Sequence, residues 1–168
     1  MANTTFSGPL RSESTIKTVS KNATTGTVTE VVTFGDGPIS LSDGDVTLTN
    51  ATHSGRILLV PDGSQDKTYT LPAPIAGSMF RFVYAGGAAD ATDALIITPG
   101  NTNFYIGGIT HLDTNADNVT VFSNGSSNSS VQLNVPQAFD ITIIGKDTTN
   151  YQIFGTVTST TVPAFADQ

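Results

Sequence analysis

The sequence lacks cysteine and tryptophan, and it has few charged residues. Without cysteine the chain can form no disulfide framework, no thiolate nucleophile and no cysteine-ligated zinc site. Charged residues make up 12% of the chain, which is about half of their usual share in globular proteins. The polar surface must therefore be built mainly from neutral side chains.

Basic residues are scarce and dispersed, and the formal net charge is −7. Nucleic acids and anionic lipid surfaces both attract clusters of lysine and arginine, so we expect neither as a partner. The longest apolar run, residues 57–60, is far too short to cross a bilayer. The polar first residues also lack the apolar stretch of a secretory leader.

Catalytic patterns are missing as well. His53 and His111 are the only histidines, and each lies in a predicted turn, where a solvated or hydrogen-bonded side chain is the ordinary interpretation. There is no Gly-x-Ser-x-Gly elbow, no phosphate-binding loop and no His-Glu-x-x-His sequence. The sequence therefore contains none of these catalytic motifs.

One short segment begins like a calcium-binding loop. Asp113, Asn115 and Asp117 place oxygen atoms at alternating positions, as such loops do. The sixth position of the loop is Asn118 instead of glycine, and the twelfth is Asn124 instead of a bidentate glutamate. The three residues remain a candidate, but a turn rich in aspartate and asparagine explains them without a metal.

The residues that are abundant favour β structure. The chain holds 27 threonines and 15 serines but only two glutamates, Glu13 and Glu30. Helix surfaces normally use glutamate, lysine, glutamine and arginine, whereas a β-branched threonine fits the pleated surface of a strand. Composition alone thus predicts an all-β protein.

Strand-like runs recur from residue 27 onward, with glycine, proline, aspartate or asparagine between them. The alternation in one of them predicts that Val131, Leu133 and Val135 point inward. The only helix candidate, residues 88–94, is more consistent with a loop. About ten short strands predict an antiparallel β-sandwich or jelly roll-like domain. The runs are residues 27–34, 45–49, 56–60, 68–71, 79–84, 95–97, 104–106, 119–122, 131–135, 141–144 and 151–157.

We divide the chain into an extended N-terminal arm (1–26), a β-sandwich domain (27–157) and a C-terminal tail (158–168). Large apolar residues of the arm are too widely spaced to form a core. The arm is either a disordered terminus or a segment that becomes ordered on a partner surface. In the second case its contact residues are Thr5, Phe6, Leu10, Ile16 and Val19.

Two aromatic-rich strands, 79–84 and 104–106, have one side in the core. For the other side we expect Arg81 and Tyr105 to contact a neighbouring subunit. Packing in the core alone is the alternative for such residues.

Three consecutive segments, residues 58–61, 68–74 and 76–84, together resemble β-domains of trimeric phage virion proteins. Such domains occur in marine podovirus-like head-decoration proteins and in some tail fibres. Residues 5–10 are similar to an N-terminal segment of phage structural proteins, and residues 146–155 resemble the closing strand of these domains. In that last match Tyr151 replaces tryptophan and Thr148 replaces glycine, so the match is partial.

The resemblance implies a β-sandwich, homotrimers at local threefold positions of the capsid, and an arm that clamps the major capsid protein. It also implies no enzymatic activity and no cofactor. We therefore expect a capsid decoration (cement) protein on the outer surface of a tailed-bacteriophage virion.

Two other classes stay open. A tail-fibre or spike domain that binds a host surface glycan would favour a long fibrous stem, which these residues do not contain. A secreted lectin-like or jelly-roll enzyme would need a leader and a cluster of carboxylates or histidines.

Overall fold

The computed structural model describes residues 16–34, 37–87, 92–113 and 117–168, with side chains left undescribed for 16–21 and 29–34. The chain divides into two compact units, Met1–Asp36 and Gly37–Gln168. This division differs from the predicted boundary after residue 26. The strand expected to begin the β-sandwich belongs instead to the first unit.

The first unit contains an antiparallel hairpin of β1 (Ile16–Lys21) and β2 (Val28–Phe34). Its turn is organised by Asn22, whose side-chain oxygen accepts hydrogen bonds from the backbone N–H groups of Thr24 and Thr25. Gly26 follows with a φ of 74°, a left-handed conformation that glycine adopts without steric cost. Residues 16–21, which belong to the predicted extended arm, are thus paired with β2.

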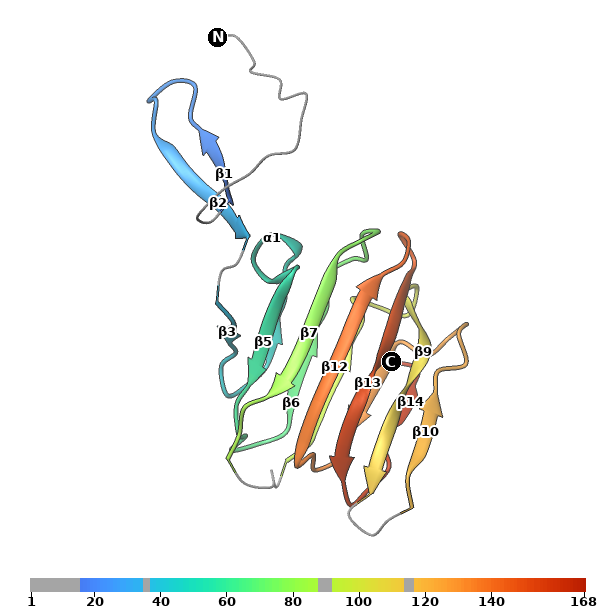
Figure 1. Ribbon diagram of the computed structural model, residues 1–168. Coiled ribbons are helices and arrows are strands. Elements are labelled where there is room, and N and C mark those ends of the chain that lie inside the picture. The colour runs from blue at the N-terminus through green and yellow to red at the C-terminus, as the bar shows by residue number, and fades with distance from the viewer. Residues whose placement is uncertain (1–15, 35–36, 88–91, 114–116) are drawn as a thin grey trace. The chain divides into compact units, whose positions relative to one another are not determined.

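The described residues of the second unit form two β-sheets and one short helix, which confirms the all-β prediction. Figure 1 shows the larger sheet face-on, with seven strands in the order β10-β9-β13-β12-β7-β5-β3. The smaller sheet has five strands in the order β14-β11-β8-β6-β4. The elements are β3 (Ile39–Ser40), β4 (Val46–Thr47), α1 (Asn50–His53), β5 (Arg56–Val60), β6 (Lys67–Thr70), β7 (Met79–Tyr84), β8 (Ala94–Ile97), β9 (Phe104–Asp113), β10 (Val119–Phe122), β11 (Ser130–Leu133), β12 (Ala138–Gly145), β13 (Asn150–Ser159) and β14 (Ala164–Ala166).

Both sheets are mixed, so the prediction of purely antiparallel strands is wrong. In the larger sheet β5 runs parallel to β3 and β7, and β13 runs parallel to β9. In the smaller sheet β6 runs parallel to β4 and β8. From β5 to β8 the chain changes sheet at every step. Two such crossings return it to the same sheet in the same direction, which produces parallel neighbours.

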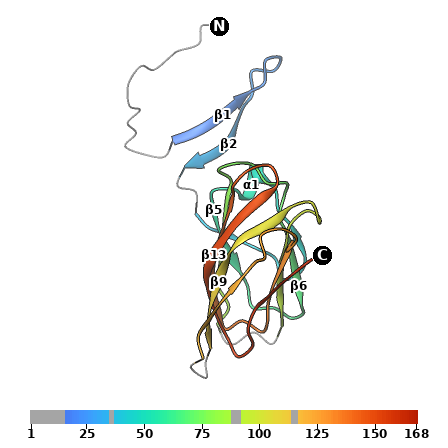
Figure 2. The same ribbon diagram turned by 90° about the vertical axis from the view of Figure 1, so that its right-hand side faces the viewer.

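Side chains from the two sheets share one hydrophobic core. The ring centroids of Tyr69 on β6 and Phe82 on β7 lie 5.8 Å apart. The hydroxyl of Tyr105 on β9 donates a hydrogen bond to the carbonyl of Ile96 on β8, at 3.2 Å. Figure 2 shows β13 and β9 of the larger sheet and β6 of the smaller sheet on opposite sides of this core. Buried positions alternate with more exposed ones along β6, β8 and β12, as expected for sheets covered on one face.

Strand β9 is longer than its sequence suggests. Two glycines, Gly107 and Gly108, were predicted to end it, but it continues to Asp113. Gly107 has a φ of 107°, and a Cβ atom there would lie 2.4 Å from the carbonyl oxygen of Ile153. Gly107 therefore permits a close approach of β13 and Gly108 a close approach of β10, and the two glycines do not end the strand.

Two further local predictions differ from the structure. Val135 was expected to point inward, but β11 ends before it, its φ is 40° and its side chain is 37% exposed. The predicted C-terminal tail contributes β14, which pairs with β11 at the edge of the smaller sheet. In the helix candidate 88–94, residues 88–91 lie outside the described part, and Ala94 begins β8.

Candidate interaction surface on the larger sheet

The outer face of the seven-stranded sheet is formed by the residues that alternate with its core positions. Leu58, Phe82, Ile141 and Ile153 point into the core, so their neighbours along each strand point outward. The register places Ile57, Arg81, Thr142 and Phe154 in one continuous cross-strand row. We call this surface the outer face.

Large apolar side chains are exposed on the outer face. Phe122 is 70% exposed and Phe154 is 47% exposed, and Ile57, Met79 and Leu112 are also open to solvent. The Phe122 ring covers Gly108, because a Cβ atom on that glycine would lie 2.8 Å from Cδ1 of the ring. Exposed apolar groups gathered on one face mark an interaction surface more often than an ordinary solvated one.

Threonines form a second cross-strand row beside these apolar groups. Asp140 pairs with Thr156, Thr156 with Thr110, and Thr110 with Thr120. The hydroxyls of Thr110 and Thr120 lie 3.4 Å apart. This row provides neutral hydrogen-bonding groups, so the outer face is polar without adding charge.

An ion pair lies at the centre of the outer face. Nε of Arg81 donates to Oδ1 of Asp140 at 2.9 Å, and a terminal nitrogen donates to Oδ2 at 2.5 Å. These hydrogen bonds lower the pKa of Asp140 and raise the pKa of Arg81 relative to their ordinary values. Both side chains are 44% exposed, so each stays accessible from outside.

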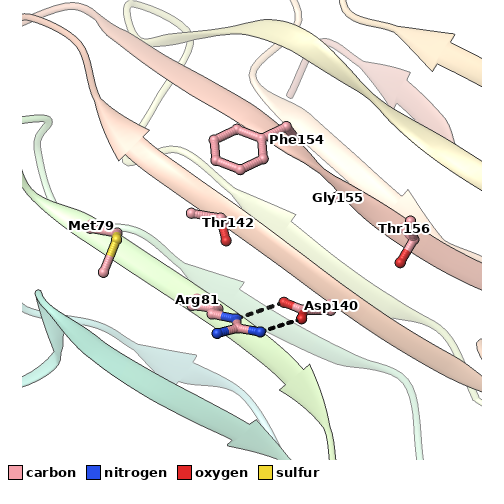
Figure 3. A pocket seen from close by; sticks show the side chains of 7 residues that line it. All are labelled: Met79, Arg81, Asp140, Thr142, Phe154, Gly155 and Thr156. Atoms are coloured by element: carbon pink, nitrogen blue, oxygen red, sulfur yellow. Dashed lines mark hydrogen bonds and ion pairs between the residues drawn. The ribbon is translucent and has the colours of Figure 1, made fainter.

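The ion pair lines a shallow depression of about 470 Å³, shown in Figure 3. Its titratable groups, Arg81 and Asp140, are already paired with each other. Both groups are exposed and can still form further hydrogen bonds, so the depression offers polar groups for binding. The depression is lined by Met79, Arg81, Asp140, Thr142, Phe154, Gly155 and Thr156.

Of the two predicted interface residues, the structure places only Arg81 on the outer face. Tyr105 is fully buried in the core, and burial raises its pKa well above the ordinary value. The prediction of Tyr105 as an interface residue is therefore wrong for this chain. The neighbours Phe104 and Ile106 are also apolar, so the sequence did not show which side of the strand faces the core.

The predicted arm residues are only partly described. Thr5, Phe6 and Leu10 lie outside the described residues. Ile16 and Val19 belong to β1, where they pair with Phe34 and Glu30. Their backbones are therefore already engaged within the hairpin.

The calcium-loop candidate gains no support. Asn115 lies outside the described residues. The backbone N–H of Asp113 donates to the side-chain oxygen of Asn118 at 3.0 Å. Within the described ranges no group of three or more histidine, aspartate or glutamate side chains is placed to hold a metal ion.

The two histidines lie in different environments. His53 is part of α1, and its Nδ1 accepts a hydrogen bond from the backbone N–H of Thr49. His111 was predicted in a turn, but it is fully buried in β9, with Nε2 3.0 Å from the hydroxyl of Ser159. The Ser159 hydroxyl donates to the carbonyl of Thr161. Both side chains are fully buried, so the pair links β9 to the end of β13.

A cluster of aspartates surrounds one end of β6. Lys67 is only 2% exposed, and its ammonium lies 3.6 Å from a carboxylate oxygen of Asp43. Asp45 accepts a hydrogen bond from the backbone of Thr68, and Asp66 accepts one from the backbone of Asp93. These carboxylates therefore fix loops around a buried cation. The Ser-Asp-Gly-Asp sequence at 42–45 was the available signal.

No protein-family model and no curated protein matches the sequence. Among the described residues, no helix has the length and apolar character needed to span a membrane. The candidate surface is therefore interpreted from its own geometry.

Proposed function

We propose that the chain is a non-enzymatic structural protein of a virion, which binds the outside of a tailed-phage head as a homotrimer and stabilises the shell. The observation that carries this proposal is the outer face. It combines exposed apolar side chains with threonine hydroxyls and a single, mutually neutralised ion pair. Such a surface is suited to stable contact with other protein surfaces.

We also infer that the two sheets form a β-sandwich. The shared core supports this, together with the hydrogen bond from the Tyr151 hydroxyl to the Pro72 carbonyl. A jelly roll is built from antiparallel strands, and the parallel pairings of β5 with β7 and of β6 with β8 argue against that variant.

The segments that resemble phage virion domains lie together in the fold. Residues 58–61 overlap β5, 68–74 overlap β6, and 76–84 contain β7. They contribute Leu58, Tyr69, Phe80 and Phe82 to the core. The resemblance therefore supports the proposed fold directly and the proposed role through it.

In this proposal the first unit is the part of the chain that binds the capsid. We propose that Thr5, Phe6, Leu10, Ile16 and Val19 contact the major capsid protein. Backbone groups at the edges of the β1–β2 hairpin are suited to strand addition. Three linked arms would act at a high effective concentration on neighbouring capsomers, so contacts that are weak singly would hold together.

Co-sedimentation of the full chain with expanded, undecorated phage heads tests the proposal. We expect saturation at three copies per local threefold position. The double variant Phe6→Asp/Leu10→Asp should lose most of this binding, because it places charge in the apolar contacts. Thr24→Ala, in the exposed hairpin turn, is the matched control and should bind like the wild type. Full binding by the double variant would rule out the arm contacts.

A tail-fibre or spike domain that binds a host surface glycan is the second candidate. The exposed Phe154 ring beside the Thr142 and Thr156 residues favours it, because saccharides bind to aromatic faces flanked by hydroxyls. Absence of head binding, together with binding to host cells or isolated glycans, would select this role instead.

A further inference from the structure

We infer that copies of this chain meet through their outer faces, with Arg81 of each copy paired to Asp140 of the next. This inference rests on the self-association in the proposed function and names the surface and residues responsible. The partner at the depression is thus a second copy of the same chain.

The distribution of charge selects this face. Eleven of the fourteen acidic residues and four of the seven basic residues lie after residue 36, so the second unit carries the whole net charge of −7. Two such units repel each other in most orientations. Among the described outward-facing positions of β5, β7, β12, β13, β9 and β10, only Arg81 and Asp140 are charged, and they cancel. A contact through this face therefore brings no unpaired like charges of the face itself together.

The ion pair has unused hydrogen-bonding capacity. Arg81 engages Asp140 with Nε and one terminal nitrogen, so its other terminal nitrogen can donate to a second carboxylate. Each oxygen of Asp140 accepts one of these bonds and can accept another. Around a rotation axis, every Arg81 can therefore bridge its own Asp140 and that of a neighbour. The result is a closed ring of alternating charges.

The apolar residues supply the driving force for this contact. Met79 and Phe154 flank the ion pair, and Ile57 lies beside Arg81 in the same cross-strand row. Burying these side chains between copies removes apolar area from water. The alternation of Arg81 and Asp140 fixes how the copies align with one another. A small saccharide in the depression would leave Ile57 and the distant Phe122 uncovered, so a second copy fits the whole face better.

A charge swap tests the inference. The double variant Arg81→Asp/Asp140→Arg keeps an ion pair within each chain and keeps complementary contacts among swapped copies. It should fold and form oligomers of wild-type size. When mixed with wild-type chains, each contact between the two types sets arginine against arginine or aspartate against aspartate. We expect native mass spectrometry to show mixed oligomers about tenfold below their statistical share.

Isotope-labelled wild type mixed with unlabelled wild type is the control, and it must exchange to the statistical distribution. Statistical mixing of swapped and wild-type chains would overturn the inference, as would a wild type that stays monomeric at the concentrations used. If swapped and wild-type chains mix statistically and added saccharides shift the NMR signals of Phe154, the outer face would be assigned to a glycan. If swapped and wild-type chains form separate oligomers but these oligomers do not bind phage heads, the inference would stand and the proposed function would be rejected.

Discussion

Individual polar atoms inside the core are satisfied by contacts that cross between the sheets. The hydroxyl of Tyr105 donates to the Ile96 carbonyl, and that of Tyr151 donates to the Pro72 carbonyl at 2.8 Å. Burial raises the pKa of both hydroxyls above the ordinary value. The cause is that a phenolate in an apolar core would lose its hydration.

These tyrosines predict a loss of stability at alkaline pH. Below about pH 10, both folded and unfolded tyrosines keep their protons, so stability does not depend on them. Above that pH the unfolded tyrosines ionise while Tyr105 and Tyr151 stay protonated, so unfolding is favoured. We expect the free energy of unfolding to fall by about 1.4 kcal/mol per pH unit for each tyrosine.

Urea unfolding between pH 8 and pH 11, a range chosen to bracket the ordinary tyrosine pKa of about 10, measures this slope. Tyr105→Phe should remove the contribution of one tyrosine to the pH dependence of the free energy of unfolding. At neutral pH it should lower the free energy of unfolding by about 1 kcal/mol, because a hydrogen bond is lost. A slope that is the same in Tyr105→Phe and wild type would contradict the assignment of the alkaline transition to this residue.

Lys67 predicts a second effect of a single residue. Its ammonium donates to the Pro61 carbonyl at 3.2 Å and lies beside Asp43, while its stem is buried. Lys67→Ala should lower the free energy of unfolding by about 3 kcal/mol, because packing and the cation near Asp43 are both lost. Lys146→Ala is the control, since Lys146 and Asp147 are exposed and 4.0 Å apart, and it should cost below about 0.5 kcal/mol. Equal effects in urea unfolding would contradict this account.

At the scale of strands, the junction of β9 and β13 depends on a glycine. Gly107→Ala would impose a side chain at a φ of 107° and against the Ile153 carbonyl. We expect it to cost about 2 kcal/mol or more in thermal or urea unfolding. Gly100→Ala is the control, because nothing lies within 4 Å of a Cβ there, and it should change stability little. A tolerated Gly107→Ala would show that β13 can move away from β9.

Strands with strong local signals could be predicted from the sequence. The bounds of β5, β7 and β10 match the predicted runs 56–60, 79–84 and 119–122, because each is rich in apolar or β-branched residues and bounded by turn residues. Strand β4 lies inside the predicted run 45–49. The two-residue strand β3 was missed, because it depends on its parallel neighbour β5, which no local pattern reveals. The parallel arrangement itself arises from crossings between sheets and was likewise invisible.

The candidate surface was only partly predictable, for a related reason. Arg81 alternates with Phe80 and Phe82, so its outward direction follows from the pattern. Tyr105 lies between apolar residues, and its burial depends on the pairing of β9 with β13. Asp140 was not anticipated, because its partnership with Arg81 joins residues far apart in the sequence.

At the scale of the whole molecule, the second unit has its own core. Among the residues whose side chains are described, the buried residues of that core lie at or after Leu41, and β1 and β2 form a two-stranded sheet of their own. A chain of residues 37–168 should therefore fold alone, with a urea midpoint close to that of the full chain. The circular dichroism spectrum and the unfolding midpoint of both proteins provide the measurement. An unfolded 37–168 chain would show that the first unit is required for the core.

The position of β13 has a consequence for the order of folding. It lies between β9 and β12, and it is the strand that joins β10-β9 to β12-β7-β5-β3. The β9–β10 and β12–β13 pairs connect segments close in sequence, so they can form early. The parallel pairing of β9 with β13, which begins at Phe104 and Asn150, forms only after the long segment between them has been ordered. Such a step is intrinsically slow. Until then β9 and β13 expose unpaired edges, and a chain stalled at this stage would be the species most prone to aggregate during synthesis.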